Sequence, residues 1–125
     1  MQHLTQAELL HALRDCYDPE LPCNIVDLGL VRSVTLTLDP DAPGAGIPGV
    51  EPKYSVAILV APSTANEATH AQLSAQVANR LAGLPSVSQT RIEIQKEPRW
   101  TPMWITPAGR RTLGLDGNPA LIQIR

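Results

Sequence analysis

Apolar residues recur with a helical or a strand period in several separate stretches of the chain. The first stretch follows a capping box, in which Thr5 is the N-cap and Glu8 stands at the third helical position. Leucines at helical spacing follow it and give one apolar stripe. This pattern predicts a first helix that ends at the break formed by Asp18 and Pro19.

Two strands are predicted next, separated by a long connection. Polar and apolar residues alternate over residues 31–38, which indicates one buried and one polar face. Residues 53–60 are apolar at nearly every position after Ser55, as is typical of a central strand covered on both faces. Between them, residues 39–52 carry four prolines and three glycines, so we expect an exposed loop insertion there.

A second helix and a third strand complete a strand-helix-strand unit. We expect Thr64 to be the N-cap of this helix, which runs to about Ala82 and is closed by Gly83. Residues 87–95 then read as a strand. Because such crossovers are right-handed and return the chain parallel to itself, the second and third strands are predicted to be parallel in a mixed sheet.

The last helix is predicted from Thr106 as N-cap and Pro107 as the first helical residue, with Gly114 at its end. Residues 120–125 alternate weakly, which is compatible with an edge strand, a segment that pairs with another subunit, or a frayed tail. The predicted fold is α+β, a small mixed sheet of three main strands covered by helices in the order α-β-β-α-β-α, with an extra C-terminal edge strand as an option.

Length and composition limit the architecture. The 125 residues fit a single domain spanning 1–125, and the absence of Phe makes the core aliphatic. We therefore expect the few large aromatic residues, which are Tyr17, Tyr54, Trp100 and Trp104, to be large pieces of that core.

Charge and cysteine content limit the partners. The net charge is −2 and no run of Lys or Arg occurs, which argues against nucleic acid or an anionic membrane as partner and favours a protein or small ligand. Cys16 and Cys23 are too few for a disulfide scaffold and lack the spacing of a zinc site. Without a signal-peptide pattern at the N-terminus, we expect a cytoplasmic location with both thiols reduced.

The most specified stretch is the loop between the first helix and the first strand. Pro19 and Pro22 stiffen it and hold the carboxylates of Asp18 and Glu20. Asp27 precedes Leu28-Gly29-Leu30, where Gly29 is expected to supply a positive φ or a close backbone approach. A rigid turn capped by Asp side chains would explain the loop by itself.

Residues 18–31, read as DPELPCNIVDLGLV, resemble the signature of the iron-sulfur cluster assembly P domain, a former domain of unknown function found in SufT and PaaD proteins. A second resemblance lies at residues 97–102 and 105–114, which are similar to the Pro-x-Trp-Thr motif and closing helix of that family. The two motifs occur in the family's order and bracket most of the chain. The resemblance implies a role in iron-sulfur protein maturation.

The resemblance also identifies a departure from the family. There, the turn after the second strand carries a threonine and, four residues later, a cysteine, whereas this chain has Val60 and Thr64. Thr64 would keep the capping role and lose the soft metal ligand. Cys23 is then the best metal-ligand candidate. Together with Asp18, Glu20 and Asp27 it would hold a metal only weakly or between two subunits. We expect no stably bound cofactor, and transient binding of iron or an iron-sulfur cluster stays open.

Other chemistry has weaker signals. A small enzyme would use Asp18, Glu20 or Asp27 as acid or base beside Thr64, and a hydrolase would need Ser63 or Thr64 activated by His70. The residues Arg99, Trp100, Met103 and Trp104 are typical of a protein-binding patch, although the tryptophans would equally cover the end of the sheet.

The function we expect is that of a non-enzymatic accessory factor, which contacts iron-sulfur scaffold or client proteins through the acidic loop and the tryptophan patch. A homodimer is a further option. Similarity to PaaD gives the alternative of an accessory subunit of an oxygenase complex. Within the loop, we expect Asp27 to be structural, capping the turn that follows it, and Glu20 to face outward for recognition.

Overall fold

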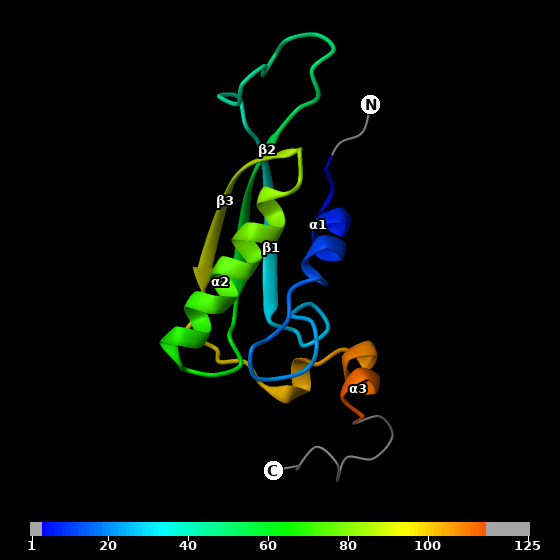
Figure 1. Ribbon diagram of the computed structural model, residues 1–125, viewed down its shortest axis with the longest axis vertical. Helices are drawn as coiled ribbons and strands as arrows, with labels where there is room; N and C mark the ends of the chain where they lie inside the picture. The colour runs from blue at the N-terminus through cyan, green and yellow to red at the C-terminus, as the bar shows by residue number, and fades with distance from the viewer. Residues whose placement is uncertain (1–3, 115–125) are drawn as a thin grey trace.

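The computed structural model describes residues 4–114, which form three helices and one mixed sheet. Strands β1 (Val31–Leu38), β2 (Tyr54–Val60) and β3 (Val87–Ile94) lie in the order β1-β2-β3, with β1 antiparallel and β3 parallel to β2 (Figure 1). The predicted α+β class, element order and parallel crossover are confirmed. The edge strand considered for residues 120–125 lies outside the described residues.

The helices are α1 (Gln6–Leu13), α2 (Glu67–Ala82) and α3 (Pro107–Leu113). The first two contact each other and pack on the sheet, whereas α3 lies at the end of the molecule where β1 begins (Figure 1). A short 3-10 helix, η1 (Pro102–Trp104), was not indicated by the periodicity. No helix in residues 4–114 is long and apolar enough to cross a membrane.

The core lies between α1, α2 and one face of the sheet. On β2, Val56, Ile58 and Val60 are buried there, beneath Leu73 and Val77 of α2. The main cluster of buried residues consists of Leu9, Leu13, Cys16, Cys23, Ile25, Leu28, Leu30, Val56, Ile58, Val60, Leu73, Val77, Leu81 and Ile105. The core is therefore aliphatic, as the composition predicts.

The expectation that β2 is covered on both faces is wrong. Its second face carries Ser55, Ala57 and Leu59, which are only partly buried, and the neighbouring Thr35 and Arg91 are exposed. Small and β-branched side chains suit this open face because they tolerate water without exposing a large apolar surface. The apolar run in β2 reflects its central position rather than two covering layers.

The first helix is shorter than its periodicity predicts. Its N-cap Thr5 accepts a hydrogen bond from the Glu8 amide at 3.1 Å, as expected, but the helix ends at Leu13. The chain then turns so that Tyr17 forms a β-bridge with Asn24. Tyr17 is consequently 52% exposed and is not the core residue that its aromatic ring suggested.

The loop at residues 39–52 is mostly exposed, in agreement with its composition, and its base is joined to the sheet. The Asp39 amide donates to the carbonyl of Lys53 at 2.9 Å, and the Asp39 carboxylate accepts hydrogen bonds from the Ser88 hydroxyl and the Asp41 amide. These hydrogen bonds, led by that from Ser88, lower the pKa of Asp39. The loop is thereby held at the far end of the sheet from α3 (Figure 1).

The second helix begins later than expected, because Asn66 and not Thr64 is its N-cap. The Asn66 side chain accepts from the amides of Ala68 and Thr69 at 2.8 and 3.2 Å. Thr64 lies two residues earlier, and its hydroxyl accepts from the Asn66 amide at 3.3 Å and from no amide of the first turn of α2. A Ser/Thr turn has therefore taken the place of the predicted cap.

This difference gives a test of the helix start. We expect Asn66→Ala to lower the free energy of unfolding by about 1 kcal/mol, because two amides lose their acceptor, and Thr64→Ala to lower it by no more than about half as much. Urea unfolding of both variants would measure the difference. A larger loss in Thr64→Ala would place the cap at Thr64 instead.

Candidate functional site

The loop between α1 and β1 is organised around the buried carboxylate of Asp18, whose residue is only 6% exposed. One oxygen accepts from the amides of Glu20 and Leu21 at 2.8 and 2.7 Å, and the other accepts from the Ser63 hydroxyl at 2.9 Å. The first two bonds close the turn, and the third joins it to the segment after β2. Asp18 thus has a structural role, since its carboxylate accepts all three of these hydrogen bonds.

A second attachment fixes the same loop to α2. The Gln76 side chain accepts from the Tyr17 amide at 2.7 Å and donates to the Tyr17 carbonyl at 2.9 Å. Arg80, one turn further along α2, forms an ion pair with Asp15 at 3.0 Å. The exposed Tyr17 ring therefore projects from a backbone that is held on both sides.

Glu20 is exposed, but its carboxylate also contacts α2. It accepts a hydrogen bond at 3.1 Å from the hydroxyl of Thr69, a buried residue in the first turn of that helix. A carboxylate near a helix N-terminus is favoured by the helix dipole. Glu20 is exposed, as expected, while its carboxylate also has this partner within the chain.

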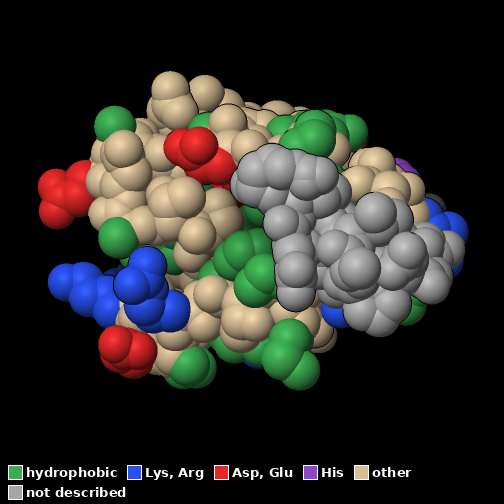
Figure 2. Space-filling view, turned by 90° about the horizontal axis from the view of Figure 1, so that it is seen from below, with side chains coloured by type: hydrophobic (Ala, Val, Ile, Leu, Met, Phe, Trp, Pro, Cys, Tyr) green, Lys and Arg blue, Asp and Glu red, His purple; other side chains and the backbone are tan. Residues whose placement is uncertain are grey.

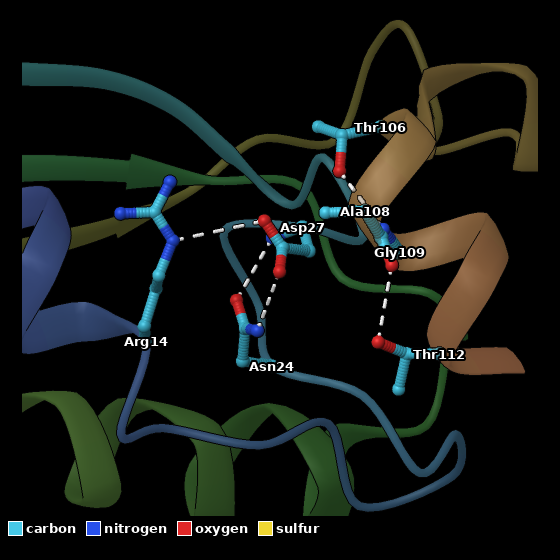
Figure 3. A network of polar contacts seen from close by, with 7 residues as sticks. All are labelled: Arg14, Asn24, Asp27, Thr106, Ala108, Gly109 and Thr112. Atoms are coloured by element: carbon cyan, nitrogen blue, oxygen red, sulfur yellow. Dashed lines mark hydrogen bonds and ion pairs between the residues drawn. The ribbon is translucent and has the colours of Figure 1, made fainter.

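Asp27 does not cap the turn that follows it. Its carboxylate accepts from the Asn24 side-chain amide at 2.9 Å and lies 3.7 Å from Arg14 Nε, while Asn24 in turn accepts from the Asp27 amide at 2.9 Å (Figure 3). The cap is therefore Asn24, and Asp27 orients it. The prediction that Asp27 is structural agrees with these contacts, but through different partners.

The segment after β3 docks on backbone carbonyl groups of this loop. The Thr106 amide donates to the Asp27 carbonyl at 2.8 Å, and the Trp100 indole donates to the Leu28 carbonyl at 2.7 Å. A Cβ on Gly109 would lie 2.6 Å from that Asp27 oxygen, so only glycine permits this approach of α3, which Thr106 caps (Figure 3).

Gly29 permits the other close approach. Its φ is +79°, and a Cβ there would overlap the backbone carbonyl oxygen of Trp104. The ring of Trp104 is itself covered by Arg32, whose guanidinium carbon lies 3.7 Å from the ring centroid. Both tryptophans therefore hold the loop, while Arg99 and Met103, which is 82% exposed, remain available on the surface.

Both cysteines belong to the core. Cys16 and Cys23 have no exposed surface, and burial is the main cause that raises the pKa of each thiol. The negative charge of Asp27 raises the pKa of Cys23 further. Cys23 does not face an open site with Asp18 and Glu20, and residues 4–114 contain no group of three or more His, Cys, Asp or Glu arranged to hold a metal ion.

A cavity of about 660 Å³ lies between the start of α2 and the end of β3. Of the predicted site residues, only Thr64 and Arg99 line it, together with His70. The His70 Nε2 lies 2.8 Å from the Thr64 backbone carbonyl, and the Ser63 hydroxyl is directed to Asp18. The serine, threonine and histidine are therefore not assembled as a nucleophile and base, and the acidic loop lies outside this cavity.

Four residues that hold the loop were not identified from the sequence: Asn24, Ser63, Thr69 and Gln76. The spacing of Asn24 and Asp27 is a recognisable side-chain capping pattern and would have pointed to the first of them. The other three meet the loop only through the packing of α2 and the end of β2, which no local pattern reports.

Comparison with known proteins gives the fold. No family model matches the chain, and no curated protein matches it. Among solved structures, a crystal structure of domain of unknown function DUF59 from Bacillus anthracis is 22% identical with a TM-score of 0.68, over 88% of this chain and 92% of that one. A conserved hypothetical protein from Thermotoga maritima is 21% identical with a TM-score of 0.66, over 91% and 98% of the two chains.

The chain has the fold of a DUF59 domain. DUF59 is the earlier name of the iron-sulfur assembly P family that the two sequence motifs resemble. The similarity of fold covers 88% of the chain in one comparison and 91% in the other.

The close contact at Gly29 predicts an unusually large mutational effect. We expect Gly29→Ala to lower the free energy of unfolding by about 3 kcal/mol or more, because the new methyl group meets both an unfavourable φ and the Trp104 backbone. Gly46→Ala is the matched control: its φ is +81° with no atom within 4 Å, so about 1 kcal/mol is expected. Equal losses in the two variants would contradict the proposed close packing.

Burial of the thiols predicts slow alkylation. At pH 8 we expect Cys16 and Cys23 in the folded protein to react at least about tenfold more slowly than in urea, whereas a thiol introduced by Met103→Cys reacts as a free cysteine. The thiols of the unfolded chain deprotonate at about pH 8.5, and those of the folded protein deprotonate at a higher pH. The two thiols therefore contribute their full stabilisation of the folded state below about pH 8.5, and this contribution is lost as the pH rises above about 8.5 and through the folded-state pKa values. Rapid alkylation of either native thiol would show that it is accessible.

Proposed function

We propose that this protein is an accessory factor in iron-sulfur cluster assembly or iron-sulfur protein maturation, and that it acts mainly through protein contacts. The observation that carries the proposal is the DUF59-like fold, which brings the two family-like motifs into contact through Asp27, Leu28, Trp100 and Thr106. The motifs therefore form one structural unit. A unit held this firmly is suited to present a fixed surface to a partner.

The surface we propose for that contact is the outer side of the loop. Tyr17, Pro19, Glu20 and Pro22 are exposed there, and Tyr17 is the largest of them. An aromatic side chain on a backbone that is already fixed loses little entropy on binding, which is the usual character of an interface hot spot. Figure 2 shows the end of the molecule that carries the loop and α3, where hydrophobic, acidic and basic side chains are interspersed.

In this proposal the cluster is cargo held by the partners. A site on this chain would need accessible thiolates, whereas Cys16 and Cys23 are buried with raised pKa values. The Asp18 oxygens are occupied by three donors, and Asp27 by Asn24 and Arg14. These residues do not fit a stably bound cluster, and binding rather than catalysis is the proposed activity.

The first test is an anaerobic co-purification with the tagged protein from native lysate, in which mass spectrometry identifies the recovered proteins. The second test measures the activity of iron-sulfur enzymes in cells that lack the protein. We expect scaffold or client iron-sulfur proteins to be recovered, and Tyr17→Ala to reduce their recovery by about tenfold or more. Leu38→Ala is the matched control, since Leu38 is 57% exposed on β1 at the other end of the sheet.

Other results would redirect the proposal. Recovery of one oxygenase complex would support the PaaD-like alternative. Recovery of no specific protein, together with unchanged iron-sulfur enzyme activity in the deletion strain, would contradict the accessory role. Stoichiometric iron and sulfide retained by the purified protein after anaerobic reconstitution and desalting would contradict the view that the cluster is held by the partners.

A further inference from the structure

The two edges of the sheet differ in how they are covered. Along β1, helix α1 lies close by, and the Gln6 side chain donates to the Val34 carbonyl at 2.7 Å. Beyond β3, no element of residues 4–114 forms a further strand or a cover (Figure 1). An uncovered strand edge is a template for pairing with another strand.

The direction of the free amides follows from the parallel ladder. The Gln95 amide donates to the Val60 carbonyl at 2.7 Å, so Gln95 faces β2. Because the backbone groups of successive residues point to opposite sides of a strand, the amides and carbonyls of Arg91 and Glu93 also face β2. Those of Thr90, Ile92 and Ile94 point away from β2, toward the free edge. No hydrogen bond within the described part of the chain uses these outward groups.

Side chains on this edge are complementary to themselves in one register. If two β3 strands pair antiparallel about a two-fold axis at Ile92, the outward groups of Ile92 bond to their own copy, and those of Thr90 bond to Ile94 of the second copy. Arg91 then lies opposite Glu93 at both symmetry-related positions. These are non-hydrogen-bonded pairs, in which side chains come closest.

The neighbouring registers are unfavourable. An axis at residue 91 would place Arg91 opposite Arg91, and an axis at residue 93 would place Glu93 opposite Glu93, and like charges in that position destabilise a strand pair. Arg91 and Glu93 already form an exposed ion pair at 3.8 Å within one chain, with 77% and 59% of their side chains exposed. Because both side chains are largely exposed, they can turn from this pair toward the side chains of a second copy.

We propose that the protein forms a homodimer through β3, in which two copies pair antiparallel about Ile92 and build a continuous six-stranded sheet. The axis runs perpendicular to the sheet, so both α2 helices lie on the same face. On the α2 side of this edge, Glu67, His70, Ala71 and Ser74 line the cavity shared with Ile94, so two of these four side chains are small.

The test is the mass in solution, measured by sedimentation velocity over a range of protein concentrations. We expect the wild type to sediment as a dimer of the 13.5 kDa chain. Arg91→Glu and Glu93→Arg should each raise the dimer dissociation constant by on the order of tenfold or more, because each change turns two attractive pairs into two repulsive ones. The double variant Arg91→Glu/Glu93→Arg restores both pairs and should restore the dimer.

Two controls separate pairing from general effects of charge and folding. Glu51→Arg makes the same change of charge as Glu93→Arg, but in the exposed loop, and should leave the dimer intact. Circular dichroism should show unchanged secondary structure in every variant, since Arg91 and Glu93 lie on the open face of the sheet. A monomeric wild type, a dimer insensitive to the single changes, or a double variant that stays monomeric would each overturn the proposal.

Discussion

The structure depends on one buried carboxylate. Asp18 accepts hydrogen bonds from two amides of its own turn and from Ser63 after β2, so it fixes the loop internally and against the sheet at the same time. A buried carboxylate is costly unless its oxygens are satisfied, and here all three donors are supplied by groups that would otherwise need partners themselves. The loop is therefore fixed both within itself and to the segment after β2.

The C-terminal segment then uses that rigidity. It attaches to the loop mainly through backbone atoms, at the carbonyls of Asp27 and Leu28, and approaches most closely at Gly29 and Gly109. At both glycines the other backbone occupies the place that a Cβ would take in any other residue. Contacts this close require each backbone to be positioned to within a few tenths of an ångström. Two motifs that lie about seventy residues apart thus behave as one unit.

The sequence was sufficient where structure is local. The caps at Thr5 and Thr106, the strand at Val31–Leu38 and the parallel crossover all follow from periodicity and capping chemistry over a few residues. It was insufficient where two segments compete for one role. Thr64 and Asn66 are both good caps, and only the packing of α2 selects the second. The aromatic ring of Tyr17 predicted a core residue, whereas Tyr17 forms a bridge with Asn24 and is half exposed.

The loop at residues 39–52 stands at the opposite end of the sheet from the loop held by Asp18 (Figure 1). The two ends of this loop are joined by the hydrogen bond between Asp39 and Lys53. The entropic cost of closing a loop rises only slowly with its length, so doubling the length would add only about 0.6 kcal/mol to that cost. This connection is thus free to change in length during evolution. A fluorescent reporter or a second domain inserted near Gly46 would be attached at this end of the sheet and would leave the other end of the molecule unchanged.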